Sequence, residues 1–114
     1  MEEISIKDII NELIKFRDER NWKQFHTPEN LAKSIILESA ELLQNFQWGN
    51  DKTDKDNIKE ELADVMTYCL YLCEYYDFDV KVIILDKINK NRKKYPIEKS
   101  LGNRTNIINF SKLS

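Results

Sequence analysis

The sequence predicts an all-α fold with four main helices, and three observations support this class. The chain of 114 residues contains only two Gly and two Pro, so it has few of the residues that interrupt helices. Apolar residues recur at intervals of three and four, which is the period of an amphipathic α-helix. Several segments also begin with residues that commonly cap helices. We therefore expect long helices joined by short loops, in a single domain that spans residues 1–114.

The first two helices are predicted over residues 5–20 and about 27–46. Ser5 and Asp8 have the spacing of a capping box, in which each side chain binds the backbone N–H of the other residue. Thr27 supplies a capping hydroxyl and is followed by a proline, which is favoured at the first helical position. The residues between the two helices break the apolar pattern and are expected to form a loop with two aromatic side chains.

Two further helices are predicted over residues 54–76 and 79–93. Pro96 ends the last of them, because the residue before a proline resists the α conformation. The chain from residue 97 onward shows no clear period, and we expect its end, from about residue 106, to be flexible.

The two cysteines of the chain, Cys69 and Cys73, lie in the apolar part of the third predicted helix. They have no CxxC spacing and no histidine nearby, so a zinc site lacks ligands. We expect both to be small buried thiols.

Composition excludes several classes of protein. Hydrophobic residues make up 41% of the chain and charged residues 33%, as in a soluble globular domain. The formal net charge of −2 gives no basic surface for polymeric nucleic acid, and no apolar run approaches the roughly 20 residues that span a membrane. The acidic N-terminus lacks the basic region of a secretory signal, so we expect a cytoplasmic protein.

Two pairs of carboxylates are the main chemical signal in the sequence. Glu38 and Glu41 are three residues apart on the second predicted helix, and Glu61 and Asp64 have the same spacing on the third. This spacing places both members of a pair on one edge of a helix. Glu38 also interrupts an apolar stripe, where an ionised carboxylate is costly without compensation. Four gathered acids repel one another unless a cation lies among them, and oxygen ligands alone select Mg²⁺, or Mn²⁺ as a substitute.

Less specific interpretations of the acids remain open. A single Glu-x-x-Glu pair on a helix usually lies on a solvated face. Glu38 and Lys87 alternatively form one buried ion pair without catalytic meaning. In that case the chain is a non-enzymatic helical interaction protein.

The fourth predicted helix and the aromatic residues suit a nucleotide. Lys87 and Asn91 continue an apolar stripe of that helix, and the basic run over residues 87–94 can neutralise phosphate oxygens. Part of this run is explained by the preference of cations for a helix C-terminus. Aromatic rings stack on nucleobases, and the candidates for this contact are Trp22, Phe25, His26, Trp48 and Tyr68.

Several motifs of the chain follow the order found in one enzyme family. They are Phe16-Arg17-Asp18-Glu19-Arg20-Asn21-Trp22-Lys23-Gln24-Phe25-His26-Thr27-Pro28-Glu29-Asn30-Leu31, Glu38-Ser39-Ala40-Glu41-Leu42, Phe46-Gln47-Trp48, Glu60-Glu61-Leu62-Ala63-Asp64-Val65 and Lys87-Ile88-Asn89-Lys90-Asn91-Arg92-Lys93-Lys94-Tyr95-Pro96. With these motifs the chain resembles the MazG-like, all-α nucleoside triphosphate pyrophosphohydrolases, and in particular their dCTP pyrophosphatase branch. The resemblance covers about residues 16–105. It implies a MazG-like helical bundle that is completed by assembly into homodimers or homotetramers.

The resemblance also implies a reaction, a cofactor and a set of site residues. The reaction is Mg²⁺-dependent hydrolysis of dCTP, or a modified dCTP, to the nucleoside monophosphate and pyrophosphate. Water is the expected nucleophile, with Glu38 or Glu41 as its proton acceptor and Lys87 as a further catalytic residue. The implied metal ligands are Glu38, Glu41, Glu61 and Asp64. The implied substrate-binding residues are Trp22, His26, Trp48, Tyr68, Asn91, Arg92, Lys94 and Tyr95.

Two departures from the family pattern leave the base preference open. Leu37 stands where many MazG relatives have the first acid of a Glu-Glu-x-x-Glu motif, and residues 106–110 do not follow the usual ending of the dCTP branch. Another deoxynucleotide, such as dUTP, therefore remains an alternative substrate.

Overall fold

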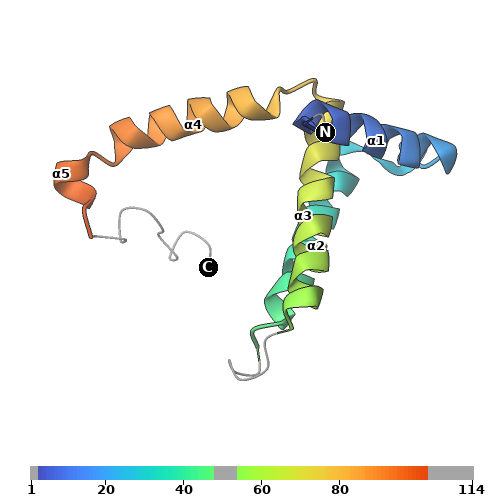
Figure 1. Cartoon of the computed structure of the whole chain (residues 1–114), viewed down its shortest axis with the longest axis horizontal. Helices are drawn as coiled ribbons and strands as arrows, with labels where there is room; N and C mark the ends of the chain where they lie inside the picture. The colour runs from blue at the N-terminus through green and yellow to red at the C-terminus, as the bar shows by residue number, and fades with distance from the viewer. Residues whose placement is uncertain (1–2, 48–53, 103–114) are drawn as a thin grey trace. The chain divides into compact units, whose positions relative to one another are not determined.

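The computed structural model describes residues 3–47 and 54–102, and within these residues it is helical without any strand (Figure 1). The predicted all-α class with four main helices is therefore confirmed. The elements are α1 (Ile6–Glu19), a short 3₁₀ helix η1 (Lys23–Phe25), α2 (Pro28–Gln44), α3 (Lys55–Tyr75), α4 (Val80–Lys94) and α5 (Ile97–Ser100). The expected flexible tail from about residue 106 lies outside the described residues.

The chain divides into two compact units, Met1–Phe78 and Asp79–Ser114, and each is described by itself. The first unit contains α1, η1, α2 and α3, and the second contains α4 and α5. The prediction of one continuous domain stays a prediction.

Side-chain caps begin the helices at the expected places. At α1, Ser5 Oγ accepts from the N–H of Asp8 at 3.1 Å, and Asp8 Oδ2 accepts from the N–H of Ser5 at 2.9 Å, so the predicted capping box is present. Thr27 caps α2 by accepting from the N–H of Asn30 at 3.2 Å. Asp54 and Asp79 cap α3 and α4 in the same way. Each cap satisfies a backbone donor that the first turn of a helix leaves unpaired.

The core of the first unit lies where α1 and α2 pack on α3. Leu31 of α2 is 2% exposed and Tyr71 of α3 is 5% exposed. The Tyr71 hydroxyl donates to the carbonyl oxygen of Leu13 at 2.8 Å, which ties α3 to α1. Figure 1 shows α2 and α3 side by side along their length. This pairing decides which acidic side chains can meet.

Two details differ from the expectations. Cys69 is exposed and Cys73 is only half-buried, so the expectation that both thiols are buried is wrong. The packed face of α3 is centred on Tyr71, and a residue two positions away points about 200° around the helix. The short helix α5 was not predicted, because one turn is too short to leave a periodic pattern in the sequence.

No helix among residues 3–47 and 54–102 is both long enough and apolar enough to cross a membrane.

Candidate metal centre and adjacent cavity

Three carboxylates meet where α2 packs against α3. Glu38 comes from α2, and Glu61 and Asp64 come from successive turns of α3. One carboxylate oxygen from each residue lies within 4.8 Å of the corresponding oxygens of the other two. The i, i+3 spacing on α3 and the packing of the two helices therefore bring both acidic motifs to one place.

Two of these carboxylates have buried oxygens without a hydrogen-bond partner among the described residues. They are Oε2 of Glu38 and Oε2 of Glu61. A carboxylate oxygen that is removed from water without a donor or a cation is costly, so such atoms call for a partner. Three converging carboxylates, two of them with unpaired buried oxygens, fit a hard divalent cation, since Mg²⁺ and Mn²⁺ prefer oxygen ligands. The residues present thus match the chemistry of such a cation.

The electrostatics of the cluster also suit a bound cation. Burial, followed by the neighbouring Glu41 carboxylate, raises the pKa of Glu38 from 4.5 to about 7. Smaller contributions come from Asp64 and Glu61. The pKa of Glu61 is raised for the same first two causes, burial and Glu41. Glu41 therefore acts on the cluster from the next turn of α2, although its oxygens are not among the three that converge.

The raised pKa of Glu38 predicts a pH-dependent stability for the metal-free protein. Unfolding returns the pKa to 4.5, so the folded state binds this proton more tightly between pH 4.5 and about 7. The stabilising contribution is complete below pH 4.5 and is lost as the pH rises through about 7. The free energy of unfolding can be measured by urea titration of wild type and Glu38→Gln, in the presence of a chelator, at about pH 5 and about pH 8. Between the lower and the higher pH, wild type should lose more of this free energy than Glu38→Gln. An equal difference between the two proteins at both pH values would contradict the assignment.

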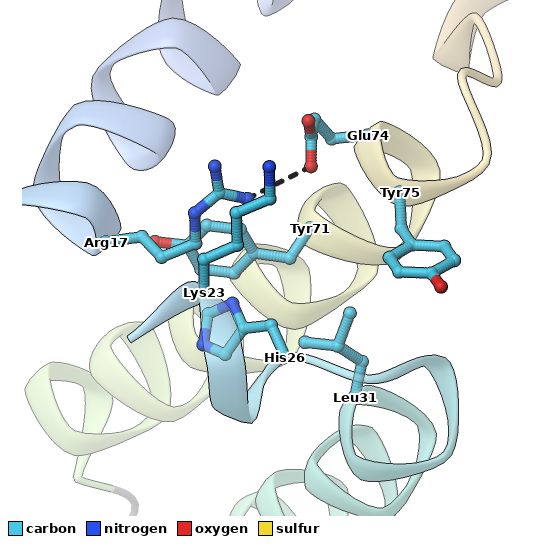
Figure 2. Close-up of a pocket in the computed structure, with 7 residues that line it drawn as sticks. All are labelled: Arg17, Lys23, His26, Leu31, Tyr71, Glu74 and Tyr75. Carbon is cyan, nitrogen blue, oxygen red and sulfur yellow. Dashed lines mark hydrogen bonds and ion pairs between the residues drawn. The ribbon is translucent and has the colours of Figure 1, made fainter. Parts of the chain in front are cut away.

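A cavity of about 270 Å³ opens at the end of α3 that follows the acidic cluster (Figure 2). Its walls come from α1, the η1 segment, α2 and α3. The lining residues are Arg17, Lys23, His26, Leu31, Tyr71, Glu74 and Tyr75. The His26 ring lies edge-on against the Tyr71 ring, with 4.6 Å between the ring centres. His26 Nδ1 is buried and has no hydrogen-bond partner among the described residues.

Tyr68 connects this cavity to the acidic cluster. Its ring centre is 6.5 Å from that of Tyr71, which lines the cavity. Burial raises the pKa of Tyr68, and the nearby carboxylates of Glu38 and Asp64 raise it further. The acidic cluster, the Tyr68 side chain and the cavity therefore follow one another along the same face of α3.

The remaining predicted site residues lie elsewhere or beyond the described residues. Trp22 is 44% exposed and packs edge-on against Phe16 at 5.8 Å between ring centres. It is not among the residues that line the cavity. Trp48 lies outside the described residues. The second unit contains Lys87, Asn91, Arg92, Lys94 and Tyr95, and their approach to the acids stays a prediction.

Of the seven lining residues, only His26 was a predicted site residue, and six were not singled out from the sequence: Arg17, Lys23, Leu31, Tyr71, Glu74 and Tyr75. A signal for the tyrosines was present, because Asp64, Tyr68, Tyr71 and Tyr75 are spaced by four, three and four and share a helix face. Arg17 and Glu74 are 57 positions apart, and only the packing of α1 on α3 shows that they meet.

The chain is also similar to known proteins. The sequence model of the MazG-like family matches residues 33–109. The chain is 32% identical over 109 residues to dCTP pyrophosphatase 1 of Mus musculus, covering 88% of this chain and 64% of that protein. The human dCTP pyrophosphatase 1 is 33% identical over 103 residues, with 82% and 61% covered. The chain thus spans less than two thirds of the length of these relatives.

A solved structure gives the same fold. The crystal structure of a pyrophosphatase from Archaeoglobus fulgidus is 36% identical in sequence and superposes with a TM-score of 0.77. The match covers 84% of this chain and 96% of the other.

Proposed function

Because this chain belongs to the MazG-like family, we propose that it hydrolyses a nucleoside triphosphate to the nucleoside monophosphate and pyrophosphate. The observation that carries the proposal is the group of three converging carboxylates, two of which have buried oxygens without a partner. The proposed substrate is dCTP or a modified dCTP. It is supported by the likeness to dCTP pyrophosphatases and by the cavity beside the acids.

The proposed cofactor is Mg²⁺, with Mn²⁺ as a substitute. Glu38, Glu61 and Asp64 would hold the cation, and Glu41, whose carboxylate interacts with that of Glu38, is the proposed fourth ligand. A divalent cation in this position neutralises phosphate oxygens and lowers the pKa of water. The carboxylates of the cluster would hold that cation, and Glu38 or Glu41 would act as the proton acceptor for water.

The other proposed contacts divide between phosphate and base. Lys87, Arg92 and Lys94 carry positive charge toward the phosphates, because cationic side chains stabilise the charge of a reacting phosphoryl group. Asn91 and Tyr95 complete this set of substrate contacts on and after α4. On the base side the proposed residues are Trp22, His26, Trp48 and Tyr68.

We propose that the chain assembles with identical copies into a homodimer or homotetramer. Large apolar side chains of the first unit lie exposed in the single chain, among them Ile36, Leu37 and Leu43 on α2 and Met66 on α3. Apolar surface of this extent favours association, and a symmetric dimer or tetramer of identical chains is the commonest way to cover it.

Metal binding tests this proposal before any substrate is known. Mg²⁺ should raise the melting temperature of the protein in a concentration-dependent way, because a ligand that binds only the folded state stabilises it. Mn²⁺ should act similarly, and Ca²⁺ serves as a comparison of ion size. A protein that neither binds Mg²⁺ nor melts at a higher temperature with it would instead be a helical interaction protein with surface acids.

A further inference from the structure

Among the described residues that line the cavity, Glu74 is the only one with a carboxylate, and its position is fixed by a buried arginine. Arg17 Nη1 donates to Glu74 Oε2 at 3.2 Å, and Arg17 is 4% exposed. Arg17 Nε also donates to Asp18 Oδ1 at 2.9 Å, which holds the guanidinium from a second side. Figure 2 shows Glu74 and His26 among the side chains that line the cavity, with Glu74 linked to Arg17. One carboxylate oxygen is therefore held by Arg17, and the Glu74 side chain is still 31% exposed, which leaves it accessible to a ligand.

The position of Glu74 relative to the acidic cluster suits a nucleotide. Both lie on α3, and ten residues separate Asp64 from Glu74, which corresponds to about 15 Å along a helix. Tyr68 and Tyr71 occupy the helix between them, and the Tyr71 ring forms part of the cavity wall. A nucleotide whose phosphates meet the acids therefore extends its base along these rings toward Glu74.

We propose that Glu74, held in place by Arg17, selects cytosine by accepting a hydrogen bond from the amine at C4 of the base. The inference rests on the proposed function and names the residue that sets its base preference. Carboxylates are the side chains that accept from this amine when proteins read cytosine in DNA. Uracil and thymine present a carbonyl oxygen at the same position, and two facing acceptors repel each other. The free carboxylate oxygen of Glu74 thus favours one pyrimidine and disfavours the other two.

Other groups of the cavity recognise features that these pyrimidines share. The Lys23 ammonium can donate to the carbonyl at C2, which cytosine and uracil both have. Tyr71 and Tyr75 offer aromatic surface, which every base can contact. Glu74 is therefore the lining residue whose loss should change the choice between bases more than the binding of all bases.

A purely structural ion pair between Arg17 and Glu74 predicts a different result. In that case its loss lowers stability and acts equally on every substrate. The Glu74→Gln variant keeps the shape of the side chain and an oxygen that can accept from Arg17, so it should remain folded. The amide can donate as well as accept, and it should no longer distinguish an amine from a carbonyl.

The test is to measure kcat/KM for dCTP and dUTP with wild type, Glu74→Gln and the control Glu12→Gln, an exposed acid of α1. Wild type should prefer dCTP, and Glu74→Gln should lower the dCTP-to-dUTP ratio by about tenfold or more, mainly through KM for dCTP. Glu12→Gln should keep the wild-type ratio. A third substrate, the deoxynucleoside triphosphate of pyrimidin-2-one, lacks the C4 amine. It should react less efficiently than dCTP with wild type, but should show little further loss with Glu74→Gln.

The outcomes separate this inference from the proposed function. A wild type that cleaves no nucleoside triphosphate refutes the proposed function. An active wild type without preference for dCTP over dUTP, or an active Glu74→Gln variant that retains the wild-type ratio, refutes only the role of Glu74. If Glu74→Gln does not fold, the pyrimidin-2-one substrate decides with wild type alone: a rate equal to that of dCTP overturns the inference.

Discussion

Replacing Glu38 by Gln is expected to abolish nucleoside triphosphate cleavage while the protein stays folded. Glu38 is the member of the converging group that comes from α2, so its replacement would remove a proposed metal ligand contributed by that helix. Loss of a residue that only supports a metal ligand already costs about 10- to 100-fold in metal affinity or activity, and loss of the ligand itself should cost more. The measurement is kcat/KM at saturating Mg²⁺, together with a Mg²⁺ titration of the melting temperature.

The same substitution should stabilise the metal-free protein near neutral pH. The pKa of Glu38 is raised because burial and the neighbouring Glu41 carboxylate both disfavour its charged form. The amide of Gln carries no charge, so the variant avoids this cost. Glu29→Gln is a matched control, because Glu29 is an exposed acid in the first turn of the same helix. Full activity in Glu38→Gln would rule out Glu38 as a ligand or a proton acceptor.

Replacing Lys87 by Met should lower kcat/KM by about 100-fold and leave Mg²⁺ binding intact. Met keeps an unbranched side chain but removes the charge that is expected to stabilise the reacting phosphates, and a single such contact contributes about 10²- to 10³-fold in other enzymes. Thermal melting with and without Mg²⁺ should show the wild-type shift, since the carboxylates of the first unit are unchanged.

Lys90→Met supplies the control for this change. Lys90 lies one turn further along α4 and is expected to be an ordinary exposed residue, so its loss should change kcat/KM by less than about twofold. Equal losses in the two variants would mean that the basic run acts through its overall charge, and the role assigned to Lys87 would be wrong.

The acidic pairs show how far the sequence alone can lead. Their spacing places each pair on one helix edge, and the apolar stripe around Glu38 indicates that its edge faces another helix. The structure then brings Glu38 together with Glu61 and Asp64. These relations are local to a helix or follow from the pairing of two neighbouring helices, so the sequence pattern contains them.

Contacts between segments far apart in the sequence could not be predicted from the sequence pattern. Arg17 resembles any charged residue of an amphipathic helix, and its burial depends on the packing of α1 against α3 and on Glu74. The exposure of Cys69 has the same origin, because an apolar pattern around most of a helix does not reveal which face the neighbours cover. That α4 lies near the acids stays a prediction from the family resemblance, since the two units are described separately.

We expect the chain to cleave nucleoside triphosphates between the α and β phosphates. This expectation is tested most directly by incubating the protein and Mg²⁺ with a panel of nucleoside triphosphates and identifying the phosphorus-containing products by ³¹P NMR. We predict a nucleoside monophosphate and pyrophosphate in equal amounts, with dCTP or a modified dCTP as the best substrate. Orthophosphate as the sole inorganic product, or no cleavage of any triphosphate, would contradict this expectation.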